Sequence, residues 1–256
     1  MPFLNLILDV SHDVATLTLN RPDSLNALSE DLLHELIRAS EQIGASDARA
    51  VVVSGAGRAF CAGVDIETFM TLVDNPDVNQ RYETFRLGSA MADAIEAIPQ
   101  VTVAALHGFV VGGGLVLAAA CDLRVAADDT VFSIPEVDMG IPLGWGGIER
   151  LVREIGPART KEFVMTCRRF TAQEAATAGF LNSVVAEGEV QATALSLATV
   201  IASKPRIPIE ITKAHVAEVL SGAVSRDDDM SAVERFDDPE SVAARAPYLA
   251  KFLTRP

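Results

Sequence analysis

Residues 97–121 form an uncharged stretch that limits the fold more than any other part of the sequence. Its apolar part, from Val101 to Ala120, is long enough to cross a lipid bilayer. However, Gly108 and three consecutive glycines at 112–114 interrupt it, and acidic residues flank it where a membrane span would carry basic anchors. We therefore predict a buried strand, a glycine-rich turn and a buried helix here, and no membrane span.

The rest of the sequence predicts an α/β core followed by a helical region. Apolar runs at 3–10 and 14–19 indicate a β-hairpin, and beyond residue 187 the pattern is helical throughout. Between them strand and helix signals alternate, which is typical of an α/β fold. The further predicted elements are strands at 50–54, 101–106, 123–126, 130–133 and 183–186, a helix capped by Ser29, a mostly helical segment at 67–98, and helices after Gly144, at Pro157 and after Thr171. We divide the chain into a core at 1–190 and a C-terminal helical region at 191–256.

Charge and composition exclude several classes of protein. The chain carries 21 Lys and Arg against 35 Asp and Glu, a formal net charge of -14, which disfavours binding to nucleic acid or to an anionic membrane. Its three cysteines and four histidines are scattered, so we expect neither a disulfide framework nor a metal site. The first residues lack the basic region of a secretion signal, and we expect a cytoplasmic protein.

Three glycine-rich corners, each following an apolar strand, are the candidate functional motifs. They lie at 60–65, 108–114 and 134–140, whereas the nucleotide-binding glycine fingerprint, the Walker sequence and the Gly-x-Ser-x-Gly motif are absent from the sequence. A helix that begins in such a corner directs free N–H groups at a ligand and can stabilise developing negative charge. Close packing of a helix on a sheet would explain the glycines equally well.

Taken together, several short motifs resemble the crotonase family, also called the enoyl-CoA hydratase/isomerase superfamily. They follow one another in the family's order and at its spacing over about residues 3 to 185. The matching pieces are Leu19-Asn20-Arg21-Pro22 with Leu25-Asn26-Ala27-Leu28, Ala59-Phe60-Cys61-Ala62-Gly63-Val64-Asp65, the run from Gly108 to Asp122, Pro135-Glu136 with Gly140, Gly146-Gly147 before Leu151, and Ala175 to Leu181.

The resemblance implies an α/β fold built as a crotonase-like spiral of ββα units, and an acyl-CoA thioester as the substrate. It implies no metal and no cofactor beyond the coenzyme A of that substrate. It also implies a homotrimer or a dimer of trimers, assembled through the C-terminal helices at 191–256. The apolar residues of that region are more than a free appendage would expose, which fits assembly.

The resemblance also assigns site residues. It places the two backbone N–H groups of an oxyanion hole at Val64 and Gly113, and the catalytic carboxylate at Glu136. Further substrate-binding positions that it implies are Arg21, Ser24, Leu25, Ala62, Asp65, Ile66, Gly112 and Pro135. Arg21 and Arg58 lie in the loops nearest the expected nucleotide, although either could be an ordinary exposed side chain.

The acid/base residues separate the reactions within the family. Family hydratases carry a second glutamate two residues after the triple glycine, where this sequence has Val116. Hydration normally needs two carboxylates, one for the water and one for the α carbon. With Glu136 alone, the natural chemistry is a proton shuttle that converts a 3-enoyl-CoA into the conjugated 2-enoyl-CoA.

Two alternatives stay open. A hydratase could use a substitute acid from the polar helical segment, at Glu67, Glu83 or Glu96. A catalytically silent acyl-CoA-binding protein could also have kept the pocket and lost the second glutamate.

We expect the remaining polar or aromatic residues near the corners to have mainly structural roles. Asp138 should point away from Glu136. Cys61 should serve packing, His107 should be a hydrogen-bonded core residue, and Asp65 and Asp122 should hold loops. Trp145 could either shape the acyl pocket or belong to the core.

Overall fold

Six strands make the central sheet, in the spatial order β1-β2-β3-β4-β6-β9. The first two, β1 (Leu6–Asp9) and β2 (Val14–Leu19), form the predicted antiparallel hairpin, and every later neighbouring pair is parallel. The parallel strands that follow are β3 (Ala50–Gly55), β4 (Val101–Leu106), β6 (Leu123–Ala127) and β9 (Ser183–Val185). This arrangement comes from a computed structural model that describes residues 2–10, 12–222 and 228–253.

A second, three-stranded sheet contains two strands that the sequence did not predict, β5 (Phe109–Val111) and β8 (Phe170–Thr171). Its order is β5-β7-β8, with β5 parallel to β7 (Val131–Ser133) and β8 antiparallel to β7. We predicted only a turn at β5, because three residues between two glycines are too few to show a strand period. Strand β5 connects the end of β4 to the glycine-rich corner at 112–114.

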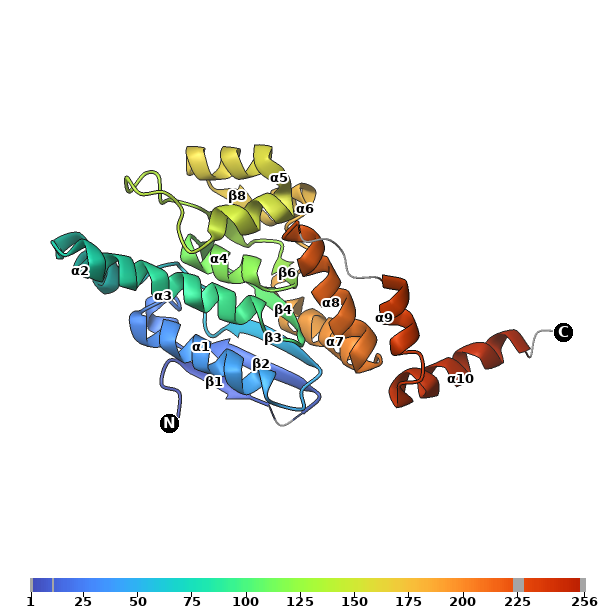
Figure 1. Cartoon of the computed structure of the whole chain (residues 1–256). Helices are drawn as coiled ribbons and strands as arrows, with labels where there is room; N and C mark the ends of the chain where they lie inside the picture. Colours follow the sequence, from blue (N-terminus) through green and yellow to red (C-terminus); the bar gives the residue numbers. More distant parts are fainter. Residues whose placement is uncertain (1, 11, 223–227, 254–256) are drawn as a thin grey trace.

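Helices cover both faces of the central sheet (Figure 1). One face packs under α1 (Glu30–Gly44), α3 (Val78–Glu96) and α4 (Gly113–Ala120), and the other under α7 (Val190–Ala202). Successive side chains of a strand point to opposite faces of the sheet, so each face has its own core. In β3, Val51 and Val53 belong to the core under α1, α3 and α4, and Val52 belongs to the core under α7. The described helices include none long and apolar enough to cross a membrane.

The predicted helical segment at 67–98 is two helices, α2 (Ile66–Asp74) and α3, separated by residues 75–77, where Asn75-Pro76 predicts an interruption. The helices expected after Gly144 and at Pro157 join as α5 (Gly147–Thr166), with a kink at Gly156 where φ is 73°. The helix expected after Thr171 is α6 (Ala172–Ala178), which a capping box of Thr171 and Glu174 begins.

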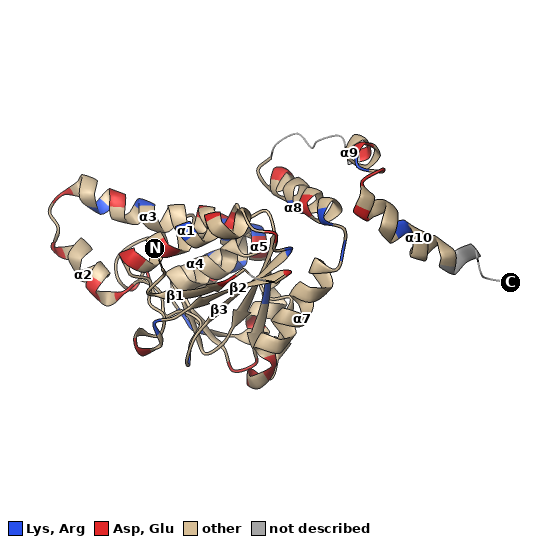
Figure 2. Ribbon diagram, turned by 90° about the horizontal axis from the view of Figure 1, so that it is seen from below, with Lys and Arg blue, Asp and Glu red and all other residues tan. Residues whose placement is uncertain are grey.

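Helix α8 (Arg206–Leu220) lies beside β4, where Lys213 contacts Ile98 O and Asp122. Helices α9 (Asp228–Glu234) and α10 (Pro239–Leu253) extend away from the sheet at the opposite end from α2 (Figure 1). Acidic segments lie on both α2 and α9, far apart on the molecule (Figure 2). Arg49 fixes the start of α10 through a two-pronged ion pair with Glu240, with distances of 2.9 and 2.8 Å. The boundary that we place at residue 190 stays a prediction, and α7 on its C-terminal side packs against the sheet.

Arg124 joins the end of α4 to the segment before β9 and gives a test of this packing. Its buried guanidinium donates to the carbonyl oxygens of Cys121 and Phe180 and pairs with Glu154. Arg124→Met should lower the free energy of unfolding by about 3 kcal/mol, because buried partners lose their donor. Urea unfolding followed by circular dichroism would measure it.

Arg159→Met is the matched control for that substitution. The Arg159 side chain is 52% exposed and pairs with Glu162 on the surface, so its loss should leave the unfolding curve unchanged within error. Equal effects of the two substitutions would contradict the structural role of Arg124.

Candidate active site

The three glycine-rich corners of the sequence meet in space. Cys61 in the first corner exchanges hydrogen bonds with β5, through Cys61 N to Phe109 O and Val111 N to Cys61 O, both at 3.0 Å. The Gly112 N–H of the second corner donates to Ser133 O at 3.0 Å, directly before the third. Backbone hydrogen bonds, and not side chains, therefore set the distances between the corners.

Two backbone N–H groups at this junction are available to a ligand. The Leu28 N–H donates to Gly63 O at 2.8 Å, and the Asp65 N–H donates to Leu28 O at 3.1 Å. Leu28 therefore pairs with the residues on both sides of Val64. Among the residues that the structure describes, the Val64 N–H has no backbone acceptor. The Gly113 N–H has none either, because it opens α4 and has no carbonyl one turn earlier in the helix.

These two donors lie close to each other. A Cβ atom placed on Gly63 would lie 3.8 Å from Gly113 N, and Val64 and Gly113 line the same cavity. This arrangement suits an oxyanion hole, in which two N–H groups receive one oxygen that gains negative charge.

Glu136 brings a carboxylate to the same junction. The side chain is 8% exposed, and its Oε1 would lie 2.4 Å from a Cβ placed on Gly112. Its Oε2 is buried and lacks a hydrogen-bond partner within the described chain. Burial raises the pKa of Glu136 above its ordinary value, because the charged form is desolvated. The carboxylate is therefore a stronger base than one in water and is free to accept a proton.

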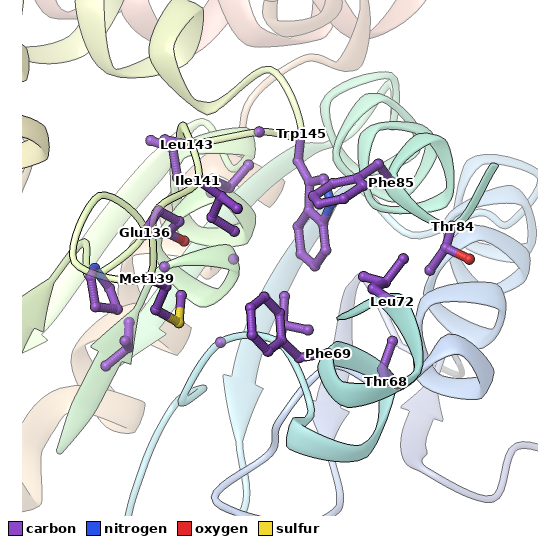
Figure 3. A pocket seen from close by; sticks show the side chains of 18 of the residues that line it. Thr68, Phe69, Leu72, Thr84, Phe85, Glu136, Met139, Ile141, Leu143 and Trp145 are labelled. Carbon is purple, nitrogen blue, oxygen red and sulfur yellow. The ribbon is translucent and has the colours of Figure 1, made fainter. Parts of the chain in front are cut away.

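The cavity at this site has a volume of about 150 Å³ and mostly apolar walls (Figure 3). Helices α2 and α3, which we call the lid, supply Thr68, Phe69, Leu72, Thr84 and Phe85. Residues that we did not predict are Leu33, Ile141 and Leu143, which no motif in the sequence distinguishes from ordinary core residues, and Met139, which lies in the third corner but was not singled out. Glu136 is the one ionisable side chain among the described residues that line it.

The substitute acids considered for the alternative of a hydratase do not line the cavity of this structure. Glu67 and Glu83 are exposed, and neither lines the cavity. Glu96 pairs with Arg150 and Arg153 at 2.5 and 2.8 Å, away from the cavity wall. Val116 does line the cavity, as a buried apolar side chain.

Arg21 is bonded within the protein rather than free for a nucleotide. Its Nη1 donates to Asp65 Oδ2 at 2.8 Å and also to Ala27 O. Asp65 in turn caps α2 by accepting from Glu67 N at 3.0 Å, the loop-holding role that we expected. The pair therefore fastens the lid helix to the loop that carries Leu28.

The other predicted binding positions divide into two groups. Ala62, Ile66, Gly112 and Pro135 line the cavity, together with Val64, Gly113 and Glu136. Ser24 and Leu25 do not, but their loop adjoins it, because Ala62 N donates to Leu25 O at 3.0 Å. Contact of any of them with coenzyme A stays a prediction.

The residues expected to be structural follow that expectation with one correction. Burial raises the pKa of the Cys61 thiol to about 12, which makes it a poor nucleophile. Asp138 is exposed and outside the cavity wall, and Asp122 accepts from Thr102 N at 2.7 Å. His107 is hydrogen-bonded to Gly57 O at 2.9 Å, but it is half-buried rather than in the core, because β4 ends one residue earlier.

Comparison with protein families gives one match over most of the chain. The model described as enoyl-CoA hydratase/isomerase matches residues 9–242. The chain is 34% identical to a crotonyl-CoA hydratase of Syntrophomonas wolfei over 88% of this chain and 86% of that protein. It is 34% identical to the human mitochondrial Delta(3,5)-Delta(2,4)-dienoyl-CoA isomerase over 77% of this chain and 63% of that protein.

Solved structures show the same fold. An enoyl-CoA hydratase from Mycobacterium smegmatis is similar with a TM-score of 0.87 and 28% identity, over 97% of both chains. An enoyl-CoA hydratase/carnithine racemase from Magnetospirillum magneticum gives a TM-score of 0.90 and 31% identity, over 98% of this chain and 94% of that one.

Gly112→Ala tests the geometry of the site. The new Cβ would occupy space that Glu136 Oε1 holds, and φ of 48° adds backbone strain. Because displacing a catalytic group by about 1 Å can reduce rates about 10²-fold, kcat should fall by that factor or more. Steady-state kinetics on the folded variant would measure it.

Gly222→Ala serves as the control, since φ there is 72° but no atom of the described residues lies within 4 Å of the new Cβ. The Gly222→Ala substitution should lower the free energy of unfolding through backbone strain and leave kcat unchanged. A Gly112→Ala enzyme as active as the Gly222→Ala enzyme would contradict the placement of Glu136.

Proposed function

Because the chain belongs to the enoyl-CoA hydratase/isomerase family, we propose that it is an acyl-CoA isomerase that converts 3-enoyl-CoA into 2-enoyl-CoA. The observation that carries the proposal is the single carboxylate of the cavity. One group that gives and takes a proton suffices for moving a double bond, whereas adding water normally needs two. Glu136 supplies that group, and the apolar Val116 stands where family hydratases carry the other.

In the proposed reaction, the thioester oxygen lies between the N–H groups of Val64 and Gly113. Glu136 removes a proton from the α carbon, and the electron pair of that bond moves through the thioester to its oxygen. The two donors stabilise the enolate, and one such donor is typically worth about 3 kcal/mol. Glu136 then returns the proton to the γ carbon, which leaves the double bond between the α and β carbons.

The lining of the cavity supports this chemistry. Phe69, Leu72 and Phe85 give the acyl chain an apolar wall, and the low local dielectric strengthens the interaction of the donors with the enolate. The buried Oε2 of Glu136 lacks a partner in the described chain, so protonating it breaks no existing hydrogen bond.

Hydration is the competing activity, because relatives of similar identity carry both names. Incubating the pure protein with paired 2-enoyl and 3-enoyl thioesters, and following products by mass and ultraviolet absorbance, separates the two. We expect the 3-enoyl thioester to become conjugated without a gain of water. Rapid hydration of the 2-enoyl thioester would refute the proposal, and no reaction with either would indicate a silent binding protein.

We also propose a homotrimer or a dimer of trimers, formed through the C-terminal helices. Val216, Val219 and Leu220 of α8 are 46 to 64% exposed in the single chain, as are Phe236 and Leu249 nearby at 60 and 53%. Apolar surface of this kind favours a protein partner, and a second copy is the one always present. A cytoplasmic location remains a prediction from the sequence.

Glu136→Gln should abolish turnover while making the protein more stable. Loss of the proton acceptor should lower kcat by about 10² to 10⁴-fold. The folded-state pKa of Glu136 is raised, so its ionisation opposes folding as pH rises from the unfolded value through the folded one. The variant should therefore have the higher free energy of unfolding at neutral pH, and the gain should vanish near about pH 3, where the carboxyl is protonated in both states.

The same pKa direction sets the pH profile of the wild type. Activity needs the ionised carboxylate, so the rate should fall on the acidic side at a pH above the ordinary glutamate range of about 4.3. A kcat profile that stays flat down to that range would show that Glu136 is not the base.

Val116→Glu tests why hydration should be absent. It would add a second carboxyl to the cavity wall, and hydration of a 2-enoyl thioester should appear or rise by at most about 10²-fold, because the new group lacks supporting hydrogen bonds. Val116→Gln is the control, since it has nearly the same size and cannot transfer a proton in this way. Equal hydration by both variants would contradict the role given to Val116.

A further inference from the structure

Trp145, the single tryptophan of the chain, has an unusual backbone conformation for its size. Its φ is 58°, and that of the next residue, Gly146, is 68°. A residue other than glycine in this left-handed region costs about 1 to 3 kcal/mol and persists only where its surroundings enforce it. The side chain is 9% exposed and lines the active-site cavity.

Two glycines from different helices make room for the indole. A Cβ on Gly88 of α3 would lie 2.0 Å from Trp145 Cε2, and a Cβ on Gly113 of α4 would lie 2.4 Å from Cζ3. Neither glycine could become alanine without moving the ring. The benzene part of the indole therefore packs directly on the residue that supplies an oxyanion-hole donor.

The backbone of Trp145 is held as well. Its carbonyl oxygen accepts from Arg150 Nη1 at 3.2 Å. Arg150 is 5% exposed and pairs with Asp93 at 2.8 Å and Glu96 at 2.5 Å, both on α3. The lid helix α3 thus fixes Trp145 twice, through the ring at Gly88 and through Arg150.

The indole and the Glu136 carboxylate line the same cavity and lie against consecutive residues, Gly113 and Gly112. The indole projects into the cavity between Ile141, on the side of Glu136, and Phe85 of the lid (Figure 3). Glu136 Oε2 lacks a partner among the described residues, so a water molecule admitted here would find a strong acceptor. Removing the indole would join the space that it fills to the existing cavity of about 150 Å³.

We propose that Trp145 is a specificity-determining residue that keeps solvent water from Glu136, so that the proton taken from the α carbon is delivered to the γ carbon of the same substrate. The inference rests on the proposed isomerisation. In that reaction the α C–H bond breaks, the proton moves to the carboxylate and a γ C–H bond forms, with no net uptake of solvent protons. Water in contact with the protonated carboxyl would exchange that proton, which a closed, dry site prevents.

Isotope transfer tests the proposal directly. A 3-enoyl thioester that carries deuterium at the α carbon should give a product with deuterium at the γ carbon in the wild type. Trp145→Ala should lose most of this label to solvent, whereas Trp145→Phe, which keeps an aromatic wall, should lose less. Equal label retention in the Trp145→Ala and wild-type enzymes would overturn the proposal.

A second measurement does not require isomerisation. Butyryl-CoA has α protons but no double bond, and in D₂O it gains α-deuterium only when Glu136 removes an α proton and the resulting carboxyl exchanges with solvent before returning it. Trp145→Ala should accelerate uptake several-fold relative to the wild type. Faster uptake without any isomerase activity in the wild type would support the role of Trp145 and refute the proposed function, and unchanged uptake would overturn the role of Trp145.

Gly88→Ala covers the case in which Trp145→Ala does not fold. Alanine favours the interior of a helix, and the nearest atoms to the added methyl group belong to the indole, so the substitution should displace the ring. It should raise solvent exchange in the wild-type background, and unchanged exchange in a folded Gly88→Ala enzyme would overturn the proposal. Where Trp145→Ala folds, Gly88→Ala should add nothing to it, and an effect of the same size in both backgrounds would show that α3, and not the indole, controls exchange.

Discussion

The candidate active site depends on a backbone without side chains at the start of α4. Gly112 and Gly113 occupy positions where a Cβ would collide with Glu136 and with Trp145, respectively. The two glycines therefore do more than permit a turn, since each leaves the space that one functional side chain occupies. Because the helix also begins here, its free N–H groups point at the same place.

Burial of the carboxylate and the absence of a second acid act together. An apolar cavity makes Glu136 a better base by disfavouring its charged form, and the cost is a less favourable free energy of folding at neutral pH. A second carboxylate would add like-charge repulsion to that desolvation and would attract water. With Val116 in its place the cavity wall is apolar, which suits transfer of a proton between two carbons of one molecule.

The cations of this acidic protein hold its elements together. Arg21 joins the lid to the neighbouring loop, Arg124 closes the end of α4, and Arg150 ties Trp145 to α3. Lys213 of α8 reaches Asp122 and the carbonyl oxygens before β4, at distances from 2.7 to 3.1 Å. Arg21, one of the two arginines that the sequence suggested for a nucleotide, therefore already has an acidic partner.

The sequence alone determined the α/β order, the β-hairpin, the cap at Ser29 and the family, because each depends on short-range patterns. It also predicted that Glu136 and Val116 belong to the site, since ordered motifs fix their positions relative to the glycine corners, and both line the cavity. Tertiary structure decided which other side chains reach the cavity. Glu67, Glu83 and Glu96 were equivalent in sequence, and only the packing of the lid excludes them. Trp145 packs between Gly88 and Gly113, which lie in two other segments of the chain. A local sequence pattern cannot predict such contacts, because only the folded chain brings these residues within a few ångströms of one another.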